Sequence, residues 1–208
     1  TANQDFGKEI RKVFNFLERK SEKEKFKYLL VAPFNLRKTL FELIEAEIQN
    51  SKDGKPAEII LKLNSLEDKK IIKKLYEASN AGVKIKLLIR GICCLIPGLK
   101  GVSENIEVIS IVDRFLEHSR VYVFHNNGDK KYFLASADWM KRNLNRRVEV
   151  AFPIFDDEIQ KQLQKMIDLH WEENLKARLI DKQQSNTYKV SNETRQIRSQ
   201  YEIYKLIK

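Results

Sequence analysis

The sequence has 208 residues, of which 42% are hydrophobic and 33% charged, a balance typical of a folded globular domain. Its formal net charge of +10 indicates an anionic partner such as a nucleotide, nucleic acid or a membrane surface, although the same excess can simply keep a protein in solution. No apolar run reaches the roughly 18 residues of a membrane-spanning helix, and the adjacent Cys93 and Cys94 exclude a disulfide framework and make a poor zinc site. Because the chain starts at Thr1 and not at Met, we expect a piece of a longer protein.

The first part of the chain alternates between helical and extended patterns. Apolar residues at helical spacing predict helices at 5–20, 36–49 and 66–80. Continuous apolar runs predict strands at 27–32, 58–63 and 84–89. Such alternation implies right-handed crossovers and a largely parallel sheet.

After Arg90 the pattern changes to short strands with short connections, which we expect at 106–112, 120–125, 131–136 and 147–152. The turn signal Asn126-Asn127-Gly128-Asp129 predicts a hairpin between the second and third of these strands. A helical turn at 139–144 favours a parallel pairing of the last two. A helix at 156–174, a polar stretch at 181–193 and a short terminal helix follow.

These elements predict an α/β fold, with a mixed, mostly parallel sheet flanked by helices and a C-terminal helical arm. The expected domains are an N-terminal helix and linker at 1–25, an α/β domain at 26–175, and a C-terminal arm and helix at 176–208.

The chain has three histidines, and their settings differ. His170 lies beside a tryptophan in a predicted helix, which is typical of a half-buried helical residue. His125 lies at the hairpin turn, where we expect it to be exposed. His118 stands at the start of a strand between Arg114 and Arg120, and it is therefore the candidate for a catalytic role.

Two further segments suit phosphate. Ser136 and Asp138 stand at a strand end and lead into basic residues that include Arg142 and Arg147, and such a segment can hold phosphate through backbone N–H groups and charge-assisted bonds. The alternative is an ordinary helix start with Ser136 or Asp138 as its cap. Arg90 closes the third strand, at the edge where open α/β sheets bind ligands. The sequence contains no Walker-type loop.

Several long stretches agree in order and spacing with one family. They are Arg90-Gly-Ile-Cys-Cys-Leu-Ile-Pro-Gly98, Ser103-Glu-Asn105, Ile111-Val-Asp-Arg-Phe-Leu-Glu-His-Ser-Arg120, Ser136-Ala-Asp-Trp-Met140, Arg142-Asn-Leu-Asn-Arg-Arg-Val-Glu149, Lys176-Ala-Arg-Leu-Ile-Asp181 and Ser185-Asn-Thr-Tyr188. Together they resemble the second C-terminal domain of bacterial polyphosphate kinase, whose fold is similar to phospholipase D. By this resemblance His118-Ser119-Arg120 stands where that superfamily has His-x-Lys, and Ser136 with Asp138 stands near its Gly-Ser-x-Asn.

The resemblance implies reversible phosphoryl transfer between ATP or ADP and inorganic polyphosphate, through a phosphohistidine in a preceding domain, so that this fragment alone is inactive. His118 would contact the nucleotide phosphates and donate a proton to the departing ADP oxygen, and Arg90 would bind ATP phosphate. Weaker expectations for the anionic lining are Arg114, Arg120, Ser136, Asp138, Arg142 and Arg147.

Mg²⁺ is expected with ATP, with its ligands outside this fragment, and no protein metal ligand is assigned here. We expect no nucleic-acid partner, a homo-oligomer in the full-length enzyme, and a cytoplasmic location, with peripheral association at the inner membrane left open. Two alternatives remain from the residues themselves: a phospholipase D-like phosphodiesterase or nuclease half, and a non-enzymatic module that binds polyanions.

Overall fold

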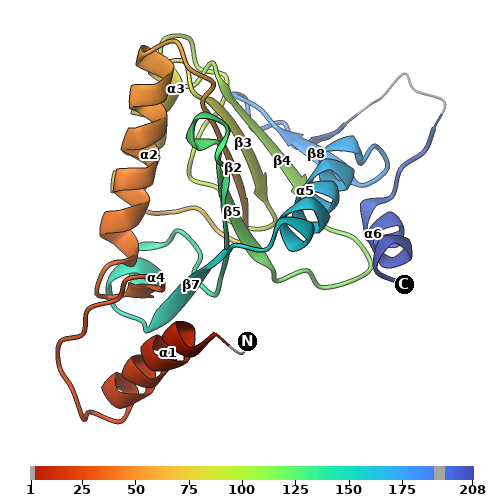
Figure 1. The fold of residues 1–208 in the computed structure, drawn as a ribbon. Helices are drawn as coiled ribbons and strands as arrows, with labels where there is room; N and C mark the ends of the chain where they lie inside the picture. Colours follow the sequence, from red (N-terminus) through yellow and green to blue (C-terminus); the bar gives the residue numbers. More distant parts are fainter. Residues whose placement is uncertain (1–2, 190–194) are drawn as a thin grey trace.

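The computed structural model describes residues 3–189 and 195–208, which form a nine-stranded sheet with helices on both faces (Figure 1). The strands are β1 (Leu30–Ala32), β2 (Glu58–Leu63), β3 (Lys84–Ile89), β4 (Ile106–Ile111), β5 (Arg120–Phe124), β6 (Lys131–Ala135), β7 (Glu149–Ile154), β8 (Ala177–Ile180) and β9 (Thr187–Tyr188). The helices are α1 (Gln4–Leu17), α2 (Leu36–Lys52), α3 (Lys69–Asn80), the short η1 (Asn126–Gly128), α4 (Lys141–Asn145), α5 (Asp157–Glu172) and α6 (Ser199–Ile207).

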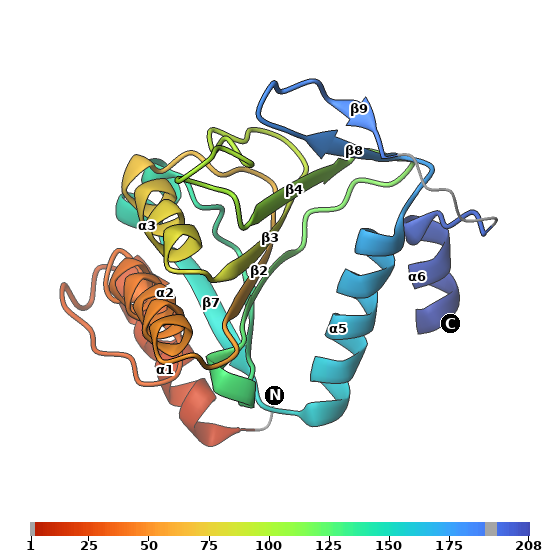
Figure 2. The ribbon, with the colours of Figure 1, turned by 90° about the horizontal axis from the view of Figure 1, so that it is seen from above.

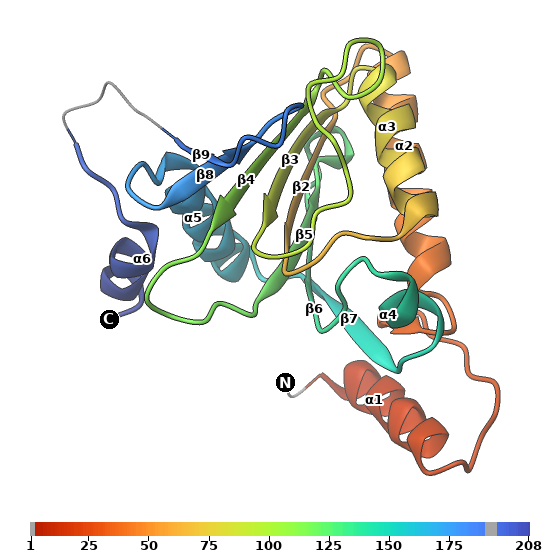
Figure 3. The same cartoon turned by 180° about the vertical axis from the view of Figure 1, so that it is seen from behind.

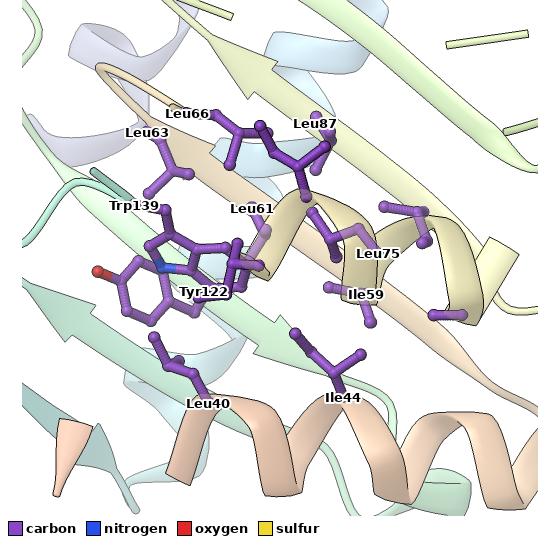
Figure 4. Packing of buried hydrophobic residues seen from close by; sticks show 14 of the residues in the cluster. Leu40, Ile44, Ile59, Leu61, Leu63, Leu66, Leu75, Leu87, Tyr122 and Trp139 are labelled. Atoms are coloured by element: carbon purple, nitrogen blue, oxygen red, sulfur yellow. The ribbon is translucent and has the colours of Figure 1, made fainter. Parts of the chain in front are cut away.

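Each face of the sheet is covered by different helices. Helices α2 and α3 lie over one face, and α5 lies over the other (Figure 2). The main core fills the first face, where the fully buried rings of Tyr122 and Trp139 meet edge to face with centroids 5.5 Å apart. Leu40 and Ile44 of α2 pack against this layer (Figure 4). Successive residues of a strand point to opposite faces, so Leu61 enters this core and Lys62 points toward α5.

The strand order is β1-β7-β6-β5-β2-β3-β4-β8-β9. The predicted α/β fold is confirmed, but the expectation of a mostly parallel sheet is wrong. In the described residues only the β2–β3 and β3–β4 pairs are parallel, and the other six pairings are antiparallel. Although β1 runs in the same direction as β2, it lies at the far edge of the sheet, beside β7.

The expected parallel pairing of the last two predicted strands is also wrong, because β6 and β7 pair antiparallel. Residues 136–148 connect them and contain only α4, a helix of five residues. At 1.5 Å of rise per residue it is too short to carry the chain back along the sheet. The chain therefore re-enters the sheet at the same end from which β6 left it, so the last residues of β6 lie beside the first residues of β7.

The predicted β5–β6 hairpin is confirmed. Asn126 and Asn127 in its turn have φ values of 48° and 54°, the left-handed region that Asn tolerates better than most residues. The predicted helix at 156–174 is α5, and it begins after Asp156, whose carboxylate caps the N–H groups of Glu158 and Ile159 (3.0 Å each).

The C-terminal segment is more than the helical arm that the sequence predicts. Strand β8 pairs with β4, and β9 pairs with β8, so residues 177–188 extend the sheet. These strands have four and two residues, too few to show a periodic pattern. The polar stretch expected at 181–193 therefore includes β9, and its residues 190–193 lie outside the described part. Within the described ranges, no helix combines the length and apolar character needed to cross a bilayer.

Candidate active site

Several sequence-predicted residues meet at one edge of the sheet, where β2, β3 and β6 end and β5 and β7 begin. His118 is exposed and lies in the loop 112–119 between β4 and β5, which we call the His118 loop. The prediction that His118 stands at the start of a strand is confirmed, because β5 begins two residues later at Arg120.

Arg120 is fixed by a buried carboxylate. Its Nε and Nη2 donate to the two oxygens of Asp138, at 3.1 and 2.9 Å. Asp138 is only 5% exposed and also accepts the backbone N–H groups of Asn64 and Ser65, at 2.8 and 3.0 Å. The hydrogen bond to Asp138 raises the pKa of the Arg120 guanidinium further above its ordinary value. Asp138 thus joins the end of β2 to the start of β5 and sets the direction of Arg120.

The other side of the guanidinium faces His118. Nη1 of Arg120 donates to the His118 carbonyl (3.0 Å), and Nη2 lies 3.1 Å from the ring nitrogen Nε2. Nη1 also lies 3.5 Å from the second ring nitrogen, Nδ1. A guanidinium can only donate hydrogen bonds, so the imidazole meets a donor group on this side. His118 is therefore presented at the surface by an arginine that cannot itself turn away from Asp138 without breaking buried hydrogen bonds.

Arg90 joins the same group through Asn64. Its Nη1 donates to Oδ1 of Asn64 at 3.0 Å, while the backbone of Asn64 is held by Asp138. The next residue, Gly91, lies so close to this turn that a Cβ would stand 3.0 Å from the Asn64 carbonyl oxygen. Asn64 therefore links Arg90 to the ion pair of Arg120 and Asp138. The sequence analysis missed this role, because a single Asn after a strand carries no distinctive signal.

Ser136 and Asp138 both lie at this edge, and their side chains are engaged with other protein groups. The Ser136 hydroxyl donates to Glu149 and accepts the Val150 N–H at 3.1 Å. Glu149 is 8% exposed and also accepts from Nδ2 of Asn143. Phosphate contact by Ser136 or Asp138 stays a prediction, and within this structure both side chains order the strand ends. Glu149 is the buried partner that the sequence analysis did not single out.

Three predicted arginines lie further out. Arg142 in α4 and Arg147 after it are exposed on the β6–β7 connection, and Arg147 reaches to 4.0 Å from Glu149. Arg114 is exposed on the His118 loop, where its Nη1 lies 3.3 Å from the Tyr201 hydroxyl. Their positions leave them accessible to an anion, and their proposed phosphate contacts stay predictions.

The two other histidines have structural partners. His125 is half-buried, and its Nδ1 accepts the Gly128 N–H at 3.1 Å across the hairpin turn. His170 is more buried than the sequence predicts, at 2% exposed, and its Nε2 lies 2.9 Å from Oε2 of Glu117. Because Glu117 directly precedes His118 in the chain, this contact brings His170 close to His118. No local sequence pattern reveals this proximity.

The residues at this edge do not form a metal cage. Within residues 3–189 and 195–208, no group of three or more His, Cys, Asp or Glu side chains is arranged to hold a metal ion. Carboxylates at this edge are already engaged: Asp138 by Arg120, and Glu149 by Asn143 and Ser136. These residues therefore do not fit a bound Mg²⁺ ion.

This arrangement of sheet and helices is shared with phospholipase D-like proteins. NucT from Helicobacter pylori superimposes with a TM-score of 0.53 at 18% identity, over 71% of this chain and 97% of NucT. Nuc from Salmonella typhimurium, a phospholipase D family member, gives a TM-score of 0.51 at 15% identity, over 74% of this chain and 96% of Nuc. At these identities the likeness shows the fold alone, and it defines a phospholipase D-like α/β domain.

A narrower family is shown by closer relatives. The family model for polyphosphate kinase C-terminal domain 2 matches residues 29–200. Polyphosphate kinases from Vibrio parahaemolyticus and Escherichia coli K12 are each 48% identical over all 208 residues, and the crystal structure of polyphosphate kinase from Porphyromonas gingivalis matches the whole chain with a TM-score of 0.96 at 42% identity. The chain belongs to the polyphosphate kinase C-terminal domain 2 family. It spans 30% of the length of these two relatives and 32% of the P. gingivalis chain.

Proposed function

We propose that the chain is the C-terminal part of a polyphosphate kinase that transfers the terminal phosphate of ATP reversibly to inorganic polyphosphate, through a phosphohistidine in a preceding domain. The observation that carries the proposal is the continuous chain of contacts from Asp138 through Arg120 to His118, with Arg90 linked through Asn64. It places two cations and an imidazole at one open sheet edge. Phosphoryl transfer depends mainly on such positioning and charge stabilisation.

In this proposal His118 contacts the nucleotide phosphates and donates a proton to the departing ADP oxygen. In the structure its two ring nitrogens face the Arg120 guanidinium, at 3.1 Å for Nε2 and 3.5 Å for Nδ1. A phosphate that enters the site competes for the Arg120 N–H groups, which leaves the His118 ring free to turn toward the leaving oxygen. General acid catalysis of this kind contributes about 10²–10⁴-fold to a rate.

Arg120 and Arg90 supply charge in a fixed direction. A guanidinium held by a carboxylate on one edge still presents N–H donors on the other, and its fork geometry suits phosphate oxygens. Arg114, Arg142 and Arg147 are exposed around the same edge and extend the positive lining. Together with the net charge of +10, this lining favours a polymer of repeated negative charge.

Other expectations belong to the full-length enzyme. Mg²⁺ would accompany ATP, but the residues that the structure describes offer it no ligand set, so we assign no step to it. We propose that the fragment alone is inactive, that the full-length enzyme is a cytoplasmic homo-oligomer, and that association with the inner membrane, if present, is peripheral.

The test uses a full-length polyphosphate kinase that contains this chain, with His118→Gln and, as the matched control, His125→Gln. We expect His118→Gln to lower ATP-driven polyphosphate synthesis by at least about 100-fold, with unchanged circular dichroism. His125→Gln should stay near the wild-type rate, because His125 only caps the hairpin turn. Near-normal synthesis by His118→Gln would contradict the proposal.

The shared fold also favours a second candidate, a phospholipase D-like phosphodiesterase half. Incubation of the full-length protein with a chromogenic bis-phosphodiester separates the two functions. A kinase should leave the diester intact, whereas hydrolysis that His118→Gln abolishes would favour the phosphodiesterase.

A further inference from the structure

The His118 loop is held by the last helix of the chain. Gln200, near the start of α6, accepts the Phe115 N–H on its Oε1 (2.8 Å) and donates from Nε2 to the Phe115 carbonyl (2.8 Å). The same Nε2 donates to Oε1 of Glu117 at 2.9 Å. Gln200 is 7% exposed. Its amide thus makes three hydrogen bonds, all to the residues that lead into His118.

The other oxygen of Glu117 is held from the sheet and from α5. Oε2 lies 2.7 Å from Nζ of Lys62 and 2.9 Å from Nε2 of His170, and both of these side chains are buried. Burial by itself would raise the pKa of Glu117, but the His170 hydrogen bond and the charge of Lys62 outweigh it and hold the pKa well below its ordinary value. Glu117 is therefore an ionised carboxylate held by β2, α5 and α6 together.

Both ring nitrogens of His170 lie within hydrogen-bonding distance of an oxygen atom. Nδ1 lies 2.6 Å from the Met166 carbonyl oxygen, which can only accept a hydrogen bond, and Nε2 faces the ionised Glu117. His170 is thus oriented by its own helix and directs Nε2 at Glu117, the residue next to His118.

A second contact ties the loop to the start of α6, through Asp113, whose side chain is 3% exposed, and Arg198, whose side chain is 34% exposed. Asp113 receives two hydrogen bonds from Arg198, at 2.8 and 2.6 Å, and the rings of Phe115 and Tyr201 lie with centroids 6.2 Å apart. Figure 3 shows the loop that leaves β4 running beside α6 before it returns to β5. The loop is thus attached to α6 at Asp113, Phe115 and Glu117.

Helix α6 has its own attachment to the end of α5. Glu173, which is fully buried, accepts the N–H of Ser199, and Asn174 exchanges hydrogen bonds with Ile197 at 3.2 and 2.9 Å. The helix is therefore seated independently of the His118 loop, so that it can hold the loop in place.

We infer that Gln200 and His170 are positioning residues, which act through Phe115 and Glu117 to hold His118 at the sheet edge. The inference rests on the proposed role of His118 and extends it to the C-terminal helix. His118 itself is exposed, and its side chain is held only by Arg120 among the contacts described above. The backbone on its other side is fixed by α5 and α6. A displacement of a reacting group by about 1 Å can cost roughly 100-fold in rate.

The kinetic test compares Gln200→Leu with Gln183→Leu in the full-length kinase. Gln183 is exposed in the same C-terminal segment and serves as the matched control. We expect Gln200→Leu to lower kcat by about 10–100-fold while KM for ATP stays within about twofold, because the fold and the arginine contacts remain. Arg198→Gln, which breaks the more exposed attachment at Asp113, should lower kcat in the same direction by a smaller factor and keeps the test valid if Gln200→Leu does not fold. A kcat unchanged in both variants would overturn the inference.

The second test reads the loop directly in the 208-residue chain, which has only three histidines. In imidazole NMR spectra we expect Gln200→Leu to shift or broaden the His118 and His170 signals and leave His125 unchanged. Unaltered His118 signals in Gln200→Leu and in Arg198→Gln would overturn the inference.

The two proposals can fail separately. If His118→Gln is inactive while Gln200→Leu and Arg198→Gln keep a normal kcat and normal His118 signals, only the positioning role is wrong. If His118→Gln is active, the proposed function is wrong, whereas the NMR result still decides whether α6 orders the loop.

Discussion

His118 lies between a buried carboxylate, that of Asp138, and a partly buried one, that of Glu117, and the two are held in different ways. Asp138, on the α2 and α3 face, fixes Arg120 and uses groups at the ends of β2 and β5, close to the apolar core around Trp139. Glu117, on the α5 face, is held by side chains from β2, α5 and α6. The Asp138 contacts connect the ends of sheet strands. The Glu117 contacts connect the His118 loop to β2 and to helices near the end of the chain. An exposed histidine is thus flanked by charged groups on both faces of one sheet.

If the Asp138 contact is part of the fold, its loss should produce the largest change in stability. Asp138→Ala leaves a guanidinium that is 10% exposed without its carboxylate, and it also leaves two backbone N–H groups without a partner. We expect the free energy of unfolding of the 208-residue chain, measured in urea, to fall by about 3–5 kcal/mol.

Asp129→Ala is the control, because Asp129 is an exposed residue at the hairpin turn. Its effect should stay under about 1 kcal/mol. A loss below about 1 kcal/mol for Asp138→Ala would show that the two carboxylates do not differ in the way described.

The Glu117 contact should have a smaller and pH-dependent effect. Because its pKa is lowered in the folded chain, its ionised form stabilises the fold above the ordinary pKa of 4.5, and this contribution is lost as the pH falls below that value. Glu117→Gln should therefore cost about 1–3 kcal/mol at pH 7. The difference from wild type should shrink between pH 4.5 and pH 3.

Exposed Glu104→Gln is the matched change for this titration, and its difference from wild type should be small at every pH. If the Glu117→Gln difference were constant with pH, the carboxylate would contribute no more than a hydrogen-bonding group.

The sequence predicted the features that depend on local pattern. Continuous apolar runs located β2 and β3 to the residue, and the Asn-Asn-Gly-Asp turn located the β5–β6 hairpin. His118 and Arg120 were found because they stand together at the start of a strand. The predicted parallel direction of β7 beside β6 was wrong, because it depends on the length of α4, which periodicity does not measure.

The contacts that hold the site could not be predicted in the same way. Gln200 and Phe115 are separated by 85 positions, and Glu117 and His170 by 53, and each is an ordinary residue in its own segment. Short strands such as β8 are defined by their partner and not by their own pattern. The sequence therefore identified the residues at the open edge, and only the fold showed what orients them.

The smallest expected effect is that of the exposed arginines Arg142 and Arg147, which are not oriented by Asp138 or Glu117. Arg142→Ala and Arg147→Ala should each lower the slope of log affinity against log salt for long-chain polyphosphate by about 1, as expected when one cation–phosphate contact is lost. Arg11→Ala on α1 is exposed and should leave the slope unchanged. An unchanged slope for both Arg142→Ala and Arg147→Ala would move the polyanion path to another face.

The most direct test of the account asks where phosphate is attached during turnover. A full-length polyphosphate kinase that contains this chain is incubated with ATP labelled in its terminal phosphate, and the acid-labile phosphohistidine is mapped by mass spectrometry. If His118 is the proton donor oriented by Arg120 and Glu117, the phosphate should lie on a histidine upstream of Thr1, and His118 should carry none. Stable phosphate on His118 would contradict the role proposed for it and would make it the nucleophile.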